Sequence, residues 1–233
     1  MSRLSSSLAV LALAACSSSY ADEPPGRRFE HDMLARMHMH ENYEVYSSIE
    51  HLLIHGKLAE ARDLARSIGI APDEAGLTAY ATQAAVVRDR AMALANATNL
   101  DDATRGAARL AAACASCHVT TNAVPELRTP PPVPADKPTV EARMSRHLWA
   151  ITRLREGMIG GLDEPWGAGL DVLAQSPLPW PAEDGERANL ARRIHEVALH
   201  AKARTHDATA DRAVSYGELL STCASCHTVA DHH

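Results

Sequence analysis

The chain has 233 residues, of which 46% are hydrophobic, 22% are charged and 4% are aromatic, and its formal net charge is −6. These fractions are those of a folded soluble protein and exclude wholesale disorder, and the acidic charge excludes the basic footprint of a nucleic-acid-binding protein. With a single Phe, the core must be filled by aliphatic side chains, alanines or an apolar group that is not an amino acid.

The chain begins with MSRLSSSLAVLALAAC, in which one Arg precedes an apolar run. The run is too short to span a bilayer and is typical of a secretory signal peptide, so residues 1–15 are predicted to be removed on export. The stretch Leu13–Cys16 (LAAC) resembles the lipobox of bacterial lipoproteins, which implies that Cys16 carries a lipid. The alternative is ordinary cleavage after Ala21.

Ser17, rather than Asp, follows this cysteine, and by the same resemblance the mature protein is expected at the outer membrane, on its periplasmic side. Residues 16–28 then form a flexible tether. Because the chain is acidic, basic proteins are the better electrostatic match as partners.

The first half of the body, residues 29–124, divides at glycine and proline into four helical stretches. The first carries MHMH and is expected to end near Gly56, and a short helix follows it. A longer helix then runs to about Ala97, and the last begins near Asp101 or Asp102. The longer helix has one apolar stripe, made of Tyr80, Ala84, Val87, Ala91 and Leu94.

A second half repeats this order after a proline-rich segment, TPPPVPADKPT, which marks a semi-rigid linker over residues 125–138. Residues 139–233 have breaks at Gly160–Gly161 and Pro177–Pro181, and a stripe at Leu190, Ile194 and Val197. The predicted fold is all-α, with two tandem antiparallel four-helix bundles.

The pentapeptide CASCH occurs at Cys114–His118 and again at Cys223–His227, 109 positions later. C-x-x-C-H is the attachment signature of c-type haem. On a helix, the two cysteines of each motif share one face and can both form thioethers with the porphyrin, while the histidine that follows reaches the iron as proximal ligand. We therefore expect two haem c groups, with thioethers at Cys114, Cys117, Cys223 and Cys226 and proximal iron ligands at His118 and His227.

Other uses of paired cysteines explain the pattern less well. A thioredoxin-like redox site is expected in a βαβ context. Zinc sites usually place their two C-x-x-C pairs much closer together in the chain. Structural disulfides are allowed outside the cytoplasm but leave both histidines unexplained.

The stretch MHMHENYEVYSSIEHLLIHGKLAEARDLA and, more loosely, MSRHLWAITRLREGMIGGLDEPWGAGLDVLA resemble the first helix and glycine turn of the cytochrome c-prime family. The resemblance covers residues 30–118 and 140–227 and implies four-helix bundles with haem on the last helix. The chain departs from the family in carrying two domains. It also has VTTN and TVADHH after the two motifs, where the family commonly has an aromatic and basic tail. The family often forms dimers, which implies that the two domains pair as a pseudo-dimer.

The distal side of each iron decides between electron transfer and ligand binding. The pattern M-x-x-H occurs in both halves, and its histidines are the favoured distal ligands, with its methionines as the alternative: His40 and His147, or Met37 and Met144. Alignment with the cytochrome c-prime first helix instead puts Leu34 and Glu141 in the distal position. His38 is a less economical distal candidate, because Ser145 stands at its position in the second half. Other histidines, among them His51 and His55, are expected at the surface or near haem propionates.

These features predict a single-electron carrier rather than an enzyme, working between redox proteins. The alternative is a gas-binding or gas-sensing protein of the cytochrome c-prime type with an open haem site. A dihaem peroxidase has less support, because Glu141 is the one candidate for a distal acid–base group.

Overall fold

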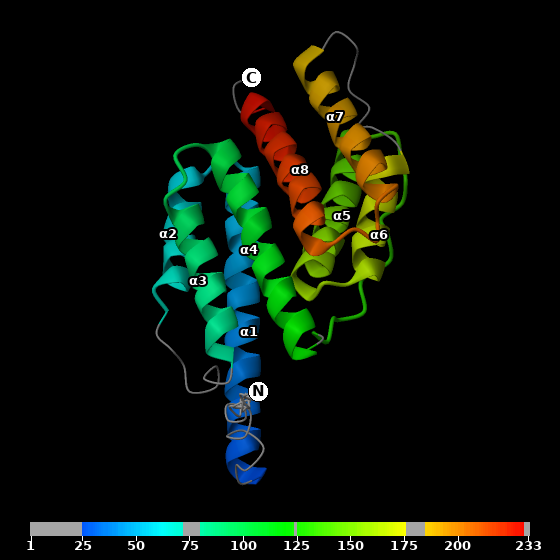
Figure 1. Ribbon diagram of the computed structural model, residues 1–233. Helices are drawn as coiled ribbons and strands as arrows, with labels where there is room; N and C mark the ends of the chain where they lie inside the picture. The colour runs from blue at the N-terminus through cyan, green and yellow to red at the C-terminus, as the bar shows by residue number, and fades with distance from the viewer. Residues whose placement is uncertain (1–24, 72–79, 124, 176–184, 231–233) are drawn as a thin grey trace, which may run out of the picture.

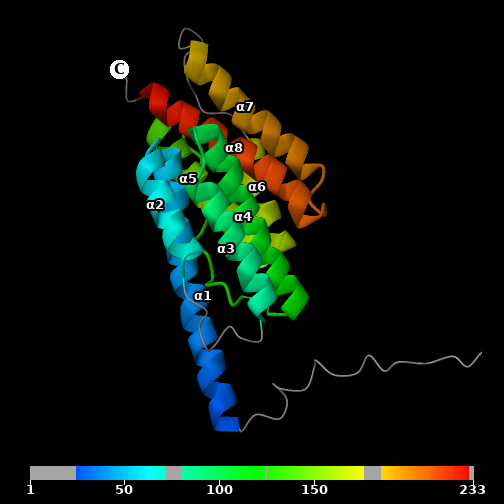
Figure 2. The same ribbon diagram turned by 60° about the vertical axis from the view of Figure 1, so that its left-hand side comes forward.

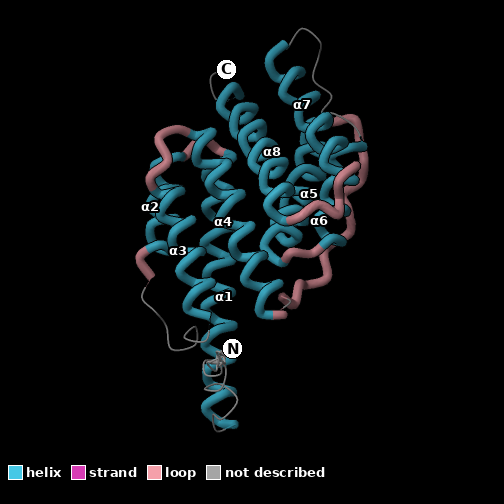
Figure 3. The backbone as a smooth tube through the Cα atoms, viewed as in Figure 1, coloured by secondary structure: helices cyan, strands magenta, loops and turns pink. Residues whose placement is uncertain are grey.

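The computed structural model describes residues 25–71, 80–123, 125–175 and 185–230. Within these ranges the chain forms helices and no strand (Figures 1 and 3), which confirms the all-α prediction. The helices are α1 (Pro25–Ile54), α2 (Leu58–Gly69), α3 (Ala81–Ala95), α4 (Leu100–Thr121), α5 (Val140–Gly160), α6 (Asp163–Gln175), α7 (Gly185–Lys202) and α8 (Thr209–Ala230).

The predicted breaks near Gly56 and at Gly160–Gly161 are confirmed by the ends of α1 and α5. Gly56 has a φ of 70° and Gly161 a φ of 65°. Only glycine adopts this left-handed conformation without steric cost, so both helices stop where the chain can turn. The predicted break at Pro177–Pro181 lies outside the described residues.

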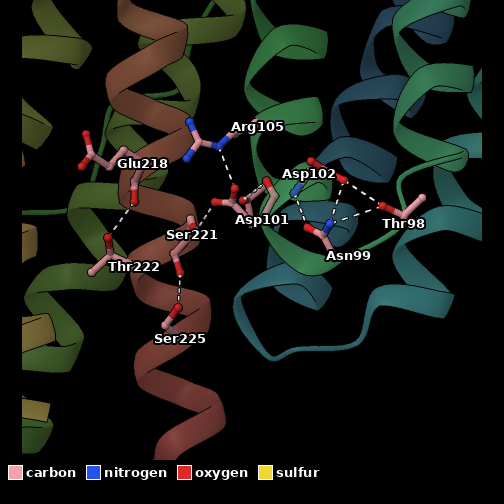
Figure 4. A network of polar contacts seen from close by, with 10 residues as sticks. Thr98, Asn99, Asp101, Asp102, Arg105, Glu218, Ser221, Thr222 and Ser225 are labelled. Atoms are coloured by element: carbon pink, nitrogen blue, oxygen red, sulfur yellow. Dashed lines mark hydrogen bonds and ion pairs between the residues drawn. The ribbon is translucent and has the colours of Figure 1, made fainter. Parts of the chain in front are cut away.

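The start of α4, Leu100, lies one residue before Asp101 and two before Asp102, the two predicted starts. Asn99 is its N-cap, and the Asn99 side chain accepts a hydrogen bond of 2.9 Å from the backbone N–H of Asp102 (Figure 4). This bond satisfies one of the amides that a helix start leaves without an intrahelical partner.

Within each half, consecutive helices pack on one another, from α1 to α4 and from α5 to α8. The predicted apolar stripes face these contacts, since Ala91 and Leu94 of α3, and Ile194 and Val197 of α7, are buried. The helical periodicity therefore located the inner face of both long helices correctly.

The last helices of the two halves, α4 and α8, pack against each other along their length (Figures 1 and 2). Ser221 of α8 donates a hydrogen bond of 2.8 Å to Asp101, and a Cβ on Gly217 would lie 3.2 Å from the Cα of Arg105. Rising numbers on α4 thus meet falling numbers on α8, so the two helices are antiparallel.

Small residues allow this close approach. The buried face of α4 consists largely of alanine, including Ala107, Ala108 and Ala111. In addition, α1 packs on α8 and α5 packs on α4, so that the buried side chains of both halves form one continuous core.

Residues 125–137 form no helix and run beside α5. Trp149 donates its indole N–H to the Pro131 carbonyl at 2.8 Å, and Arg146 donates to the Pro134 carbonyl at 2.7 Å. The proline-rich segment is thus held against the second half. None of the helices in the described ranges combines the length and apolarity needed to cross a membrane.

Candidate functional site

Both CASCH segments lie in the last turns of a helix. Cys114–His118 lies near the end of α4, and Cys223–His227 near the end of α8. Because α4 and α8 are antiparallel, the two segments lie at opposite ends of this helix pair. In the described part of the chain none of the four cysteines of these segments forms a disulfide.

The imidazole of His118 is held by a backbone group of the other half. Its Nδ1 lies 2.8 Å from the carbonyl oxygen of Ile159, in the last turn of α5. A carbonyl can only accept, so Nδ1 carries the proton and donates it, which leaves the lone pair on Nε2. Burial lowers the pKa of His118, with the bond to Ile159 opposing it, so the neutral ring is favoured.

The imidazole of His227 also meets the other half, at the end of α1. Its ring packs edge-on against the ring of His55, with 4.7 Å between the centroids. His55 in turn contacts His51 one turn earlier, at a centroid distance of 4.4 Å. The contact between His55 and His227 was not predicted from the sequence, which placed His55 at the surface or near a propionate.

The same kind of contact between the halves therefore occurs twice, because each CASCH histidine contacts the end of the first helix of the opposite half. The glycine turns also approach the opposite half closely. A Cβ on Gly56 would lie 2.8 Å from Thr228, and a Cβ on Gly161 would lie 3.0 Å from Val119. Thr228 and Val119 directly follow the two histidines. Both glycine turns thus pack against a CASCH segment of the other half.

The thiols lie in apolar surroundings. Burial, with a smaller contribution from the neighbouring thiol, raises the pKa of Cys114 to about 12 and that of Cys223 to about 12. Burial also raises the pKa of Cys117. At neutral pH these groups are protonated thiols, which are weak metal ligands and slow nucleophiles.

The predicted distal residues of the first half point outward. His40 is exposed and Met37 is 52% exposed. His38, between them, is half-buried and hydrogen-bonds Asn42 at 2.8 Å. His38 also lies three helical turns before the buried Ile49, on the same face of α1. Burial thus favours His38 over His40 as the inward-facing histidine, and ligation by His40 or Met37 remains a prediction.

Leu34, the residue favoured by the family alignment, is half-buried, whereas its second-half counterpart Glu141 is exposed. His147 is only 8% exposed. Burial, together with the positive charges of Arg143 and Arg146, lowers its pKa to about 4, so the ring is neutral. Met144, one turn earlier, is half-buried.

A second group of functional interest lies between the two CASCH segments. We call Tyr46, Glu50, Arg155 and Tyr216 the central polar cluster. Arg155 donates to Glu50 at 2.8 Å, Tyr216 donates to the other oxygen of Glu50, and Tyr46 donates to the Ala107 carbonyl at 3.1 Å. The sequence analysis did not predict this cluster. The sequence feature that could have indicated it is Glu50, a charged residue within the mostly apolar stretch IEHLLI.

The described part of the chain holds no group of three or more His, Cys, Asp or Glu side chains arranged to bind a metal ion without a cofactor. Cys16, the predicted lipid site, lies outside the described residues. Comparisons with protein-family models, curated proteins and solved structures found no match to this chain.

Proposed function

We propose that the chain is an exported dihaem cytochrome c that transfers single electrons between protein partners. The observation that carries the proposal is the geometry of His118, a neutral imidazole whose Nδ1–H is bound to the Ile159 carbonyl. Metal-ligating histidines almost always donate their other N–H in this way. Nε2 of His118 therefore retains the lone pair that iron requires.

The surroundings of this histidine fit a covalently attached haem. Cys114 and Cys117 are unpaired thiols one helical turn apart, as addition to two porphyrin vinyl groups requires. Cys223 and Cys226 have the same spacing before His227. Haem, once attached, supplies a one-electron iron couple whose potential depends on the axial ligands and on burial.

The chain's own residues would set the environment of that couple. His118 and His227 would bind the two irons. The Ile159 carbonyl and the His55 ring would orient these two imidazoles, and alanine-rich helices would exclude water. In this proposal each half is a four-helix bundle, and α4 and α8 form the interface of a covalent pseudo-dimer. The partners are redox proteins with basic docking surfaces, which complement a net charge of −6.

A specific observation favours an alternative for the first half. Because the side chains of His40 and Met37 are exposed, a haem held by His118 would lack a distal ligand from either of them, and His38 would be the nearest histidine on α1 to supply one. An open iron site suits binding of a diatomic gas, as in the cytochrome c-prime family. The second half differs, because the buried neutral His147 is available as a distal ligand.

A haem count with optical spectroscopy tests both functions. The pyridine haemochrome of the exported protein should give two haem c per chain, and one each after Cys114→Ser/Cys117→Ser or Cys223→Ser/Cys226→Ser. Carbon monoxide added to the ferrous protein then reports open sites. Rapid binding at both haems would exclude the six-coordinate electron carrier, and binding only at the haem on His118 would support a gas-binding first half.

The lipid anchor on Cys16 is a separate part of the proposal. Labelling with radioactive palmitate should mark the natural chain and not a Cys16→Ser variant, and the variant should move from the membrane fraction to the soluble periplasmic fraction. Equal labelling of both chains would rule out Cys16 as the lipid site.

A further inference from the structure

Glu50 lies buried at the meeting point of the helices that carry the two CASCH segments. Its side chain on α1 is 2% exposed. It accepts from Arg155 of α5 at 2.8 Å and from the hydroxyl of Tyr216 of α8. Tyr46, one turn earlier on α1, is bonded to α4 through the Ala107 carbonyl. The central polar cluster therefore joins α1, α4, α5 and α8.

The cluster is placed evenly between the two motifs. Tyr216 lies seven residues before Cys223 on α8, and Ala107 lies seven residues before Cys114 on α4. At the rise of an α-helix, each separation is about 10 Å along the axis. Because α4 and α8 are antiparallel, one motif lies on each side of the cluster. A charge on Glu50 therefore acts on both cofactor sites.

Glu50 is the member of the cluster suited to changing its protonation. Burial raises the pKa of Glu50, against the smaller opposing effects of Arg155 and Tyr216. Burial lowers the pKa of Arg155, but the charge of Glu50 and its tyrosine neighbours outweigh this and raise it overall. Burial raises the pKa of Tyr216, so both groups stay protonated. The pKa of Tyr46 is raised by burial in the same way.

The remaining titratable groups around Glu50 are few. On α8 the charge of Glu50 also acts on Cys223, which becomes a thioether in the haem-loaded protein. On α1, Tyr43 accepts a hydrogen bond of 3.3 Å from Arg155. From α4, Cys114 acts electrostatically on Tyr46 rather than on Glu50.

We propose that Glu50 is a redox-linked proton-binding site, so that the protein couples electron transfer to proton uptake. The inference rests on the dihaem function proposed above. When a reduced protein donor delivers one electron to either cofactor site, one proton from bulk water joins the Glu50 carboxylate, and oxidation returns both. His118 and His227, which would hold the two irons, lie 11 residues from Ala107 and Tyr216, about 17 Å along each helix. At an effective dielectric constant of about 20, one unit charge at that distance changes a proton-binding constant roughly fivefold.

The test is the pH dependence of the two midpoint potentials in the full-length, haem-loaded protein. The reduced state binds Glu50's proton more tightly, so both potentials should fall as the pH rises through the titration of Glu50. Glu50→Gln should make both potentials independent of pH over that range. Glu44→Gln changes an exposed carboxylate on the same helix and should leave the dependence unchanged.

Two results would overturn the inference while two haems are present: pH-independent potentials in the natural chain, or an unchanged pH dependence in Glu50→Gln. If Glu50→Gln does not fold, redox-difference infrared spectra of the natural chain decide. Reduction should produce the C=O band of a protonated carboxylic acid, shifted by ¹³C-glutamate, and the absence of this band overturns the inference. A haemochrome count below two per chain instead overturns the dihaem function, and the inference with it.

Discussion

Glu50 of α1 and Arg155 of α5 form an ion pair at 2.8 Å although 105 positions separate them in the chain. Glu50 is 2% exposed and the side chain of Arg155 is 12% exposed, so the pair is largely removed from water. It links the first helices of the two halves inside a shared core. A buried carboxylate at this position depends on its cation, because an unpaired charge in the interior is costly.

Removing that cation should destabilise the protein strongly. Arg155→Met leaves Glu50 without its guanidinium and should lower the free energy of unfolding by about 3–5 kcal/mol, the usual cost of breaking a buried pair. The double variant Glu50→Leu/Arg155→Met should recover most of this loss, because neither charge remains. Urea unfolding of the four proteins in the cycle measures both effects, and additive losses would contradict the prediction.

The stability of the protein should also depend on pH through Glu50. Burial raises its pKa from an ordinary value of 4.5, so the native state keeps a proton that the unfolded state has lost. Protonated Glu50 therefore contributes fully to the free energy of unfolding below pH 4.5, and this contribution is lost as the pH rises through the raised pKa. Glu50→Gln lacks this decline, so its stability relative to the natural chain should increase with pH in urea titrations. A constant difference would mean that Glu50 does not titrate.

The contact between α5 and α6 requires a glycine. A Cβ on Gly157 would lie 2.6 Å from the backbone nitrogen of Trp166, and backbone atoms cannot yield as a flexible side chain can. Gly157→Ala should therefore cost about 1–3 kcal/mol, the range for overpacked cores. Gly185, which has open space around it, is the matched control, and Gly185→Ala should cause no such loss. Equal melting temperatures for the two variants would refute the prediction.

In the dihaem protein proposed here, the contact between His55 and His227 should make the two haem sites unequal. His55→Leu replaces the imidazole ring that packs on His227 with an apolar side chain, and less polar surroundings disfavour the more highly charged oxidised iron of the proposed haem. One of the two midpoint potentials should rise and the other, at the His118 site, should stay. His51→Leu, which changes a residue that contacts His55, is the control, and His55→Asn should restore part of the shift. Movement of both potentials together would argue against a local effect.

Much of the fold was predictable from local patterns. The glycine breaks at Gly56 and Gly160–Gly161, the start of the helix near Asp101 and the apolar stripe ending at Leu94 all match the structure. These features depend on residues within a few turns of one another, where backbone conformation and helical period decide the outcome. The orientation of M-x-x-H was not predictable in the same way, since a three-residue spacing leaves open which side of the helix faces inward.

By itself the sequence determined that the chain is helical, that it repeats a four-helix order, and that each repeat ends in CASCH. These are properties of near neighbours and of a recurring motif. Only the tertiary structure decided that α4 lies antiparallel to α8, that each CASCH histidine contacts the opposite half, and that Glu50 meets Arg155 and Tyr216. These contacts join residues far apart in the chain, and they depend on which alanine and glycine faces approach closely, which the order of residues does not specify.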